Sequence, residues 1–156
     1  MEQAELKASV KAILGEYKKV INELIAVVKD LDQEMLTKVV DPITEDTDCK
    51  SIQNILTHTV QAGFNYIIYL EKHLGENKSF LSLSNYASAK EYTDQLNGMY
   101  GYCENFFKKN PSLEMEEKDP AKKFITRWGQ QYDIEQLMEH AIVHVMRHRR
   151  QIEKYV

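Results

Sequence analysis

The sequence predicts an all-α protein: a single four-helix bundle domain over residues 1–156. Three observations lead to this fold class. Four segments carry apolar residues at steps of three and four, as amphipathic helices do, and helix-capping residues mark the starts of three of them. We find no convincing strand and no internal repeat. The chain is 43% hydrophobic, which suits one substantial core, and four amphipathic helices bury their apolar faces most simply in a bundle.

The first predicted helix covers about residues 4–31 and has a scaffold role. Its apolar seam steps alternately by four and three through Leu6, Val10, Ile13, Tyr17, Val20, Leu24, Val27 and Leu31. Its other faces are rich in Lys and Glu, as expected for a solvated surface. A polar connection at residues 40–48 follows, and Pro42 opposes any continuation of the helix there.

The second predicted helix begins after the capping residue Ser51 and ends before Gly75. Gly63 lies inside it and costs about 1 kcal/mol relative to Ala, which is tolerable where a neighbouring backbone or a ligand comes close. His58 flanks the inner side of this helix. His73 lies near its end, where a cation suits the helix dipole, so we interpret His73 as a surface residue and not as a ligand.

The third predicted helix opens with a capping box at Ser88 and Glu91 and stops before Pro111. Its aromatic-rich inner stripe is core, although it could also form one wall of a pocket. Residues 112–131 are expected to be irregular, with Asp119 and Pro120 marking a turn or short helix start. Within this segment Phe124, Ile125 and Trp128 are apolar enough to fold back over one end of the bundle.

The fourth predicted helix starts at the capping residue Asp133 and runs to the C-terminus. At about 100° per residue, His148 falls within its apolar face, roughly 40° from the centre, and His144 lies at the edge, roughly 80° away. His140 points roughly 120° off. A pair of inward histidines one turn apart is as compatible with a structural role as with metal ligation, and a third ligand would favour ligation.

His58 on the second helix is the natural third ligand. Three neutral imidazoles, from His58, His144 and His148, would leave a fourth coordination position for water or substrate, as in a catalytic zinc site. Zn and Ni are our first choices, although Fe and Cu also accept imidazole ligands. Other cofactors fit less well: the Glu-x-x-His pairs of di-iron bundles and the C-x-x-C-H motif of covalent haem are absent, whereas a haem bound by two histidines is an alternative.

Charge and cysteine content narrow the function classes. The formal net charge of -4 lacks the excess of positive charge typical of nucleic-acid-binding proteins. No apolar run approaches the length of a membrane span. The N-terminus lacks the features of a secretion signal, so we expect a cytoplasmic protein without nucleic-acid or membrane partners. Cys49 and Cys103 are expected to be reduced. Cys103 is most simply core, whereas Cys49 precedes a helix start, where the dipole would favour a reactive thiolate.

Two stretches carry a resemblance to a known family. Residues 51–58, SIQNILTH, and residues 139–151, EHAIVHVMRHRRQ, resemble the two signatures of the DinB/YfiT-like superfamily, and their order, helical context and separation agree over nearly the whole chain. Two departures are Lys50, where many relatives have Trp, and Arg150, where many have Gly. The resemblance implies that His58, His144 and His148 bind a divalent metal. It also implies a homodimeric metalloenzyme, and characterised relatives include S-transferases and isomerases that use low-molecular-weight thiols such as bacillithiol or mycothiol.

Three functions are compatible with an open three-histidine site. The first, which the family resemblance implies, is thiol-dependent S-transferase or isomerase chemistry on a small electrophile, with a low-molecular-weight thiol as second cofactor. The second is hydrolysis by metal-bound water, although the zinc-protease motif HExxH is absent. The third is a non-catalytic module that binds a metal or an effector.

Several other residues near the predicted site have candidate roles. Gln151 could orient a ligand or bound water, and Tyr66 or Tyr69 could act from the second helix, where packing is the simpler role. The basic edge formed by Arg147, Arg149 and Arg150 could recognise an anionic substrate. Solvated charges that complement the helix dipole are the simpler explanation of these arginines.

Overall fold

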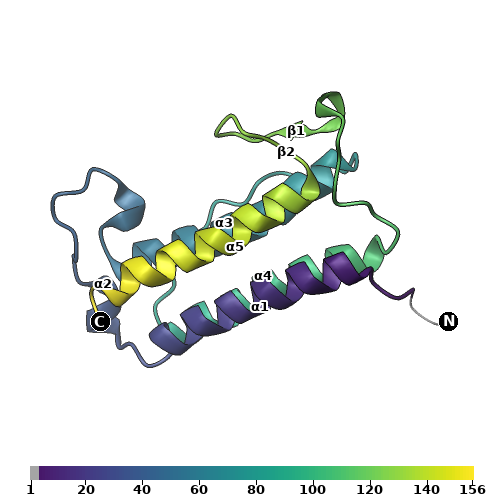
Figure 1. The fold of residues 1–156 in the computed structure, drawn as a ribbon. Helices are drawn as coiled ribbons and strands as arrows, with labels where there is room; N and C mark the ends of the chain where they lie inside the picture. Colours follow the sequence, from purple (N-terminus) through teal and green to yellow (C-terminus); the bar gives the residue numbers. More distant parts are fainter. Residues whose placement is uncertain (1–3) are drawn as a thin grey trace.

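The computed structural model describes residues 4–156, and four long helices in it pack as a bundle (Figure 1). They are α1 (Ala8–Val28), α3 (Ile52–His73), α4 (Ala89–Lys109) and α5 (Ile134–Glu153). Both α1 and α3 pack against α4 and against α5. The predicted all-α, four-helix-bundle fold is therefore confirmed. The first helix is shorter than predicted, because residues 4–7 and 29–31 lie outside it.

Side-chain caps fix where the three long helices α3, α4 and α5 begin. The Ser51 hydroxyl accepts a hydrogen bond of 3.0 Å from the Asn54 backbone N–H at the start of α3. Predicted capping boxes are present at Ser88 before α4 and at Asp133 before α5. Because a cap satisfies backbone N–H groups that the first turn leaves unpaired, it sets the first residue of the helix and thus its rotational register.

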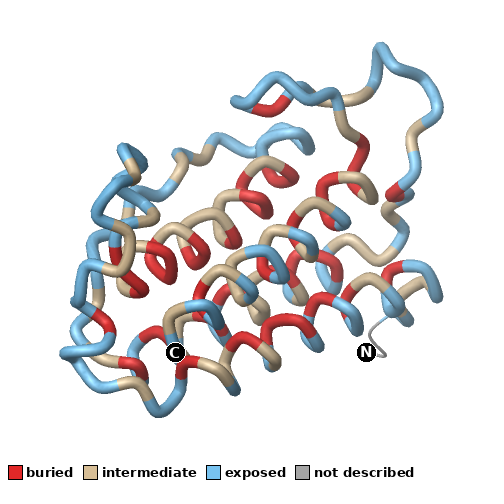
Figure 2. Tube along the Cα trace, turned by 60° about the vertical axis from the view of Figure 1, so that its left-hand side comes forward, coloured by how far each residue is buried: buried red, intermediate tan, exposed pale blue. Residues whose placement is uncertain are grey.

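The core lies between the inward faces of the four helices, where buried residues form stripes along each helix (Figure 2). Leu24, Ile55, Leu96 and Leu137, one from each long helix, are fully buried. Gly63 marks a close approach, because a Cβ atom added there would lie 2.3 Å from the Met99 sulfur on α4. The expected reason for a glycine at this position, a close neighbour, is therefore present, although the neighbour is a side chain.

The prediction that the chain has no strand is wrong. β1 (Phe124–Ile125) pairs antiparallel with β2 (Gln131–Tyr132), and the hairpin projects beside the α3 and α5 helices (Figure 1). Two-residue strands are too short to show the alternation that identifies a strand in sequence. Turn chemistry holds the hairpin instead: the Thr126 hydroxyl accepts from the Gln130 N–H at 3.0 Å, and Gly129 adopts a positive φ of 86°.

Three short helical segments complete the chain. They are α2 (Gln33–Thr37), which was not predicted, η1 (Thr47–Cys49) and η2 (Pro120–Lys122). The last one begins at Asp119 and Pro120, as expected. Ile125 does not fold back over the bundle, because 71% of its surface is exposed. Among residues 4–156, no helix combines the length and apolar character needed to cross a membrane.

Candidate metal centre

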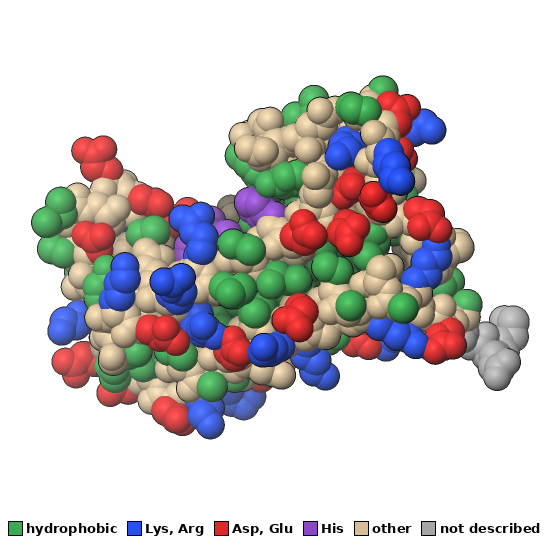
Figure 3. All heavy atoms as spheres, viewed as in Figure 1, with side chains coloured by type: hydrophobic (Ala, Val, Ile, Leu, Met, Phe, Trp, Pro, Cys, Tyr) green, Lys and Arg blue, Asp and Glu red, His purple; other side chains and the backbone are tan. Residues whose placement is uncertain are grey.

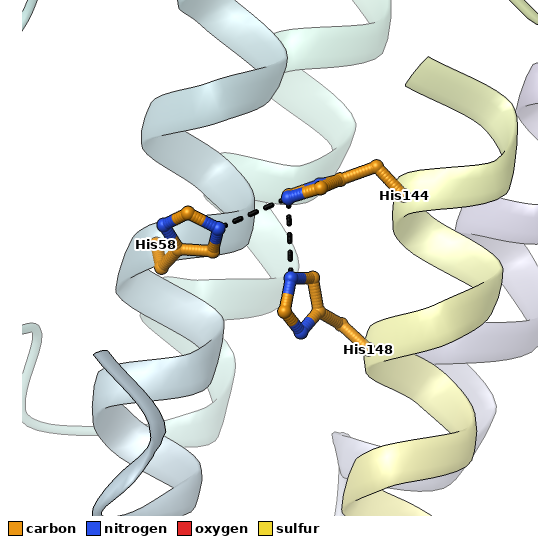
Figure 4. Close-up of side chains that lie close together, drawn as sticks. All are labelled: His58, His144 and His148. Atoms are coloured by element: carbon orange, nitrogen blue, oxygen red, sulfur yellow. Dashed lines mark hydrogen bonds between the residues drawn. The ribbon is translucent and has the colours of Figure 1, made fainter. Parts of the chain in front are cut away.

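Three histidine side chains from two helices meet at one point beside the bundle core (Figure 4). The Nε2 atom of His144 lies 3.0 Å from Nε2 of His58 and 3.1 Å from Nε2 of His148. One potential ligand atom from each residue lies within 4.8 Å of the other two. The structure thus brings together the three residues that the sequence singled out, and their role as metal ligands stays a prediction.

Helix geometry explains the convergence. His144 and His148 are one turn apart on α5, so their rings lie one above the other, with centroids 4.4 Å apart. His58 faces them from α3, which packs against α5 along its length. All three side chains are half-buried. They lie at the edge of the core, where a ligand can still reach them.

The outer two imidazoles each have a side-chain oxygen behind them. Nδ1 of His58 lies 3.3 Å from Oδ2 of Asp48, and Nδ1 of His148 lies 2.9 Å from Oε1 of Gln151. Because the Gln151 oxygen accepts a hydrogen bond, Nδ1 of His148 carries the ring proton and its Nε2 presents a lone pair inward, and the nearby Asp48 carboxylate favours the same tautomer of His58. Partners behind metal-binding histidines commonly fix the ring orientation in this way.

This arrangement fits a cation better than it fits hydrogen bonding alone. Nε2 of His144 can donate at most one proton, so it cannot donate to both neighbouring Nε2 atoms, and Nε2 of His148 carries a lone pair because its Nδ1 donates to Gln151. Zinc-type ions bind imidazole at about 2.0–2.1 Å, which in tetrahedral geometry places ligand nitrogens roughly 3.3–3.4 Å apart. The two separations, 3.0 and 3.1 Å, are a few tenths of an ångström shorter than that spacing.

Burial keeps the histidines on α5 neutral. Loss of solvation, reinforced by the neighbouring histidines, lowers the pKa of His144 to about 2. Burial likewise lowers the pKa of His148, and the hydrogen bond to Gln151 partly opposes this shift. Metal ligation requires an unprotonated nitrogen, and at neutral pH both His144 and His148 are unprotonated.

Two cavities open on either side of the cluster, and His58 and His144 line both. The first, which we call the aromatic cavity, has a volume of about 430 Å³ and is walled by Tyr66, Tyr69, Phe80, Trp128 and His140. The second, the cationic cavity, has a volume of about 570 Å³ and is edged by Arg147, Arg150 and Lys154. Figure 3 shows histidine side chains in a recess between two protruding parts of the molecule. The cluster is therefore accessible from two chemically different sides.

Two residues of the site gave no usable signal in the sequence. Asp48 lies in η1, outside the helix that carries His58, so no helical periodicity connects the two residues. His140 points away from the bundle core, as its helical angle predicts, yet Trp128 of the hairpin stacks on it at 4.9 Å between ring centroids. The hairpin, which was not predicted, turns an outward position into a cavity wall.

Other predicted residues are placed as follows. Gln151 contacts His148, while its expected role toward a ligand or water stays a prediction. Burial raises the pKa of Tyr66, which keeps this residue a neutral phenol. The Tyr69 hydroxyl accepts the Arg127 backbone N–H at 2.9 Å. His73 is exposed, as predicted.

The three arginines of the basic edge of α5 have different surroundings. Arg147 and Arg150 face the cationic cavity, whereas Arg149 pairs with Glu23 on α1 and lies 3.4 Å from Glu153. Arg149 is therefore committed to the bundle surface and is not available to a substrate.

The surroundings of Cys49 do not favour the reactive thiolate that the helix dipole alone would favour. Burial is the main effect on this thiol and raises its pKa; Gln151 opposes this shift, and the carboxylates of Asp46 and Asp48 add to it. Cys49 ends the three-residue helix η1, and its sulfur lies 3.5 Å from Oδ2 of Asp46. Both cysteines are free, and Cys103 is buried in the core as expected.

Comparison with known proteins identifies one family. The model of the DinB family matches residues 4–156, which is nearly the whole chain. No curated protein and no solved structure matches the chain. The resemblance seen in the two histidine-bearing stretches is confirmed by a match that includes both of them.

Proposed function

The chain belongs to the DinB family, and on this premise we propose that it is a metal-dependent enzyme in which His58, His144 and His148 hold a divalent ion. Zn and Ni are the first choices. The observation that carries the proposal is the set of inward-facing Nε2 atoms at 3.0 and 3.1 Å, with acceptors behind the outer two rings. Three protein ligands leave one position open for a reactant.

Thiol-dependent transfer or isomerisation on a small electrophile is the chemistry we propose. A bound divalent ion would lower the pKa of a coordinated thiol and hold the thiolate for attack. The thiolate sulfur would form a bond to the electrophilic carbon, and a leaving group would depart with its electron pair. Two reactants must meet at the histidine cluster for this step, and the two flanking cavities offer each of them its own approach.

The cationic cavity supports a thiol that carries acidic groups. Arg147, Arg150 and Lys154 edge it, and among residues 4–156 none of the three makes an ion pair with a carboxylate. Asp46 is the only acidic residue among those that line the cavity. Arginine binds carboxylate and phosphate through two parallel hydrogen bonds, so an anionic cosubstrate would be both attracted and oriented here.

Hydrolysis is the second candidate, and His140 favours it. Its ring centroid lies 6.3 Å from that of His144 in the aromatic cavity, and burial lowers its pKa, so the imidazole is neutral and can accept a proton. The Tyr132 hydroxyl lies 3.3 Å from Nδ1 of His140 and can orient the ring. A neutral base beside the histidine cluster is what attack by metal-activated water would need.

One experiment separates these functions from a non-catalytic module. The protein is stripped with a chelator, reloaded with Zn or Ni, and assayed with 1-chloro-2,4-dinitrobenzene and a panel of low-molecular-weight thiols. Thiol transfer predicts conjugation that needs both metal and thiol and is lost in His148→Ala. His73→Ala, at the exposed end of α3, is the matched control and should keep full activity.

The other outcomes of this experiment distinguish hydrolysis from a non-catalytic module. Turnover of an ester substrate that needs metal but no thiol would support hydrolysis and exclude obligatory thiol chemistry. Protein that binds no metal and converts neither substrate would support the non-catalytic module. We further propose a homodimer, on the family resemblance alone, and light scattering during size-exclusion chromatography would test it.

A further inference from the structure

The aromatic cavity collects rings from four separate parts of the chain. Tyr66 and Tyr69 come from α3, Phe80 from the segment after it, Trp128 from the hairpin and His140 from α5. Trp128 stands edge-on to both tyrosines, with ring centroids 6.0 and 5.7 Å away. Rings placed edge-on around an open space leave faces and edges for a further flat ring, because aromatic pairs prefer offset or edge-to-face geometry.

Packing of the hairpin alone does not account for this cluster. A tryptophan that served only to anchor the hairpin would be buried, yet 43% of the Trp128 surface is exposed, and Tyr69 and Phe80 are only half-buried. The hairpin is held by other contacts, including the hydrogen bond from the Arg127 N–H to the Tyr69 hydroxyl. Apolar surface is therefore left open along the wall of a preformed cavity.

Most polar side chains in the cavity already have partners. Oε1 of Gln61 accepts the Leu83 N–H at 2.8 Å, and the Asn65 amide bonds both the N–H and the carbonyl of Leu81, at 2.7 and 3.0 Å. These two amides hold the segment that carries Phe80. Arg127 differs, because its guanidinium lies 5.0 Å from the Phe80 ring and meets no carboxylate among residues 4–156.

We propose that the aromatic cavity binds a flat aromatic molecule that carries an acidic group. Its ring lies among Tyr66, Tyr69 and Trp128, and its acid pairs with Arg127. A volume of about 430 Å³ is small for a ligand cavity and suits one or two fused rings. Because His58 and His144 line the same cavity, the aromatic molecule would be the electrophilic substrate of the metal site. This assignment rests on the proposed function. The binding step itself needs neither metal nor thiol.

The single tryptophan of the chain gives a specific test. In ¹⁵N-labelled, chelator-treated protein, the indole N–H of Trp128 gives one resonance that can be followed during titration. The probes are 2-naphthoate, which is flat and anionic, 2-naphthamide, which is flat and neutral, and decahydro-2-naphthoate, which is anionic and not flat. We expect 2-naphthoate to shift the indole resonance and to bind about three- to tenfold more tightly than either analogue.

Variants test whether Arg127 causes the preference for the acid over the amide. Arg127→Gln should bind naphthoate and naphthamide equally, whereas Arg127→Lys should retain part of the preference for the acid. Arg149→Gln is the matched control, because Arg149 pairs with Glu23 and lines neither cavity, and it should bind naphthoate normally. An unshifted indole resonance at millimolar naphthoate, or an acid preference that survives in Arg127→Gln, would overturn the proposal. Normal naphthoate binding in a protein that never binds metal would instead overturn the proposed function alone.

Discussion

His58 and Asp48 form a contact across a loop boundary, with Nδ1 of the imidazole 3.3 Å from Oδ2 of the carboxylate. The carboxylate lies in η1, and the imidazole lies on the second turn of α3. Because the negative charge of Asp48 favours a proton on the nearby Nδ1, it favours the tautomer in which Nε2 presents its lone pair to His144. The loop before α3 therefore sets the direction of a ring on the helix.

Replacing Asp48 should weaken metal binding without unfolding the protein. Loss of an acceptor behind a metal-binding histidine typically reduces affinity about 10- to 100-fold. We expect a loss of this size for Asp48→Ala in a competition titration with a chromophoric chelator. Glu45→Ala removes an exposed carboxylate from the same segment and is the matched control. Equal affinities for the two variants would contradict the assigned role of Asp48.

Gln151 should have a smaller effect of the same kind. Its amide oxygen is a neutral acceptor at 2.9 Å from Nδ1 of His148, so it orients the ring without adding a charge. We expect Gln151→Ala to lose metal affinity by less than Asp48→Ala, and Gln151→Glu to restore it or exceed the original value. The same chelator competition measures all three. A loss in Gln151→Glu as large as in Gln151→Ala would argue that Gln151 does not act as an acceptor.

The fold and the site differ in how far the sequence predicts them. Caps at Ser51, Ser88 and Asp133 and the periodic apolar residues are local signals, so they predict where three of the long helices begin and which faces are buried. The inward direction of His144 and His148 follows from the same periodicity. Asp48 and Trp128 reach the site through irregular segments, whose path depends on tertiary contacts that no periodicity encodes.

The metal-free protein should lose stability as the pH falls below about 6.5. The pKa of His144 in the folded state, about 2, lies below the ordinary histidine value, so between these pH values the unfolded chain binds a proton that the folded protein does not. One such group makes the free energy of unfolding fall by at most about 1.4 kcal/mol per pH unit in this window. Urea unfolding at pH 7, 6 and 5 measures the slope, and His144→Gln should have a shallower one. Identical slopes would show that His144 is not held neutral.

Metal removal should lower the melting temperature while leaving the bundle folded. The core residues make up a continuous cluster that does not include the three histidines, so the fold does not depend on the ion. At a metal concentration 100 times Kd, binding adds about 2.7 kcal/mol of stability. Differential scanning fluorimetry should show this shift in the original protein and not in His58→Ala. A His58→Ala variant that keeps the full metal-dependent shift would exclude His58 as a ligand.

Gly63 offers a test of how closely α3 and α4 pack. A Cβ atom there would lie 2.3 Å from the Met99 sulfur and 3.2 Å from the Tyr17 hydroxyl oxygen, so Gly63→Ala must displace Met99. Overpacking of this kind typically costs about 1–3 kcal/mol, which exceeds the gain of about 1 kcal/mol from replacing glycine inside a helix. We therefore expect a net loss of stability in urea unfolding. Gly101→Ala on α4 is the control, because no atom lies within 4 Å of its added Cβ, and it should be stabilised instead.

The response of Met99 decides how the strain of Gly63→Ala is distributed. Met99 is fully buried but has three rotatable bonds, so it can move its sulfur aside more cheaply than a helix can shift. If only Met99 moves, α3 keeps its position, and the metal affinity of Gly63→Ala should equal that of the original protein. A variant that loses both stability and metal affinity would show that the helix itself has moved. His58, five residues before Gly63 on α3, would then have shifted relative to α5.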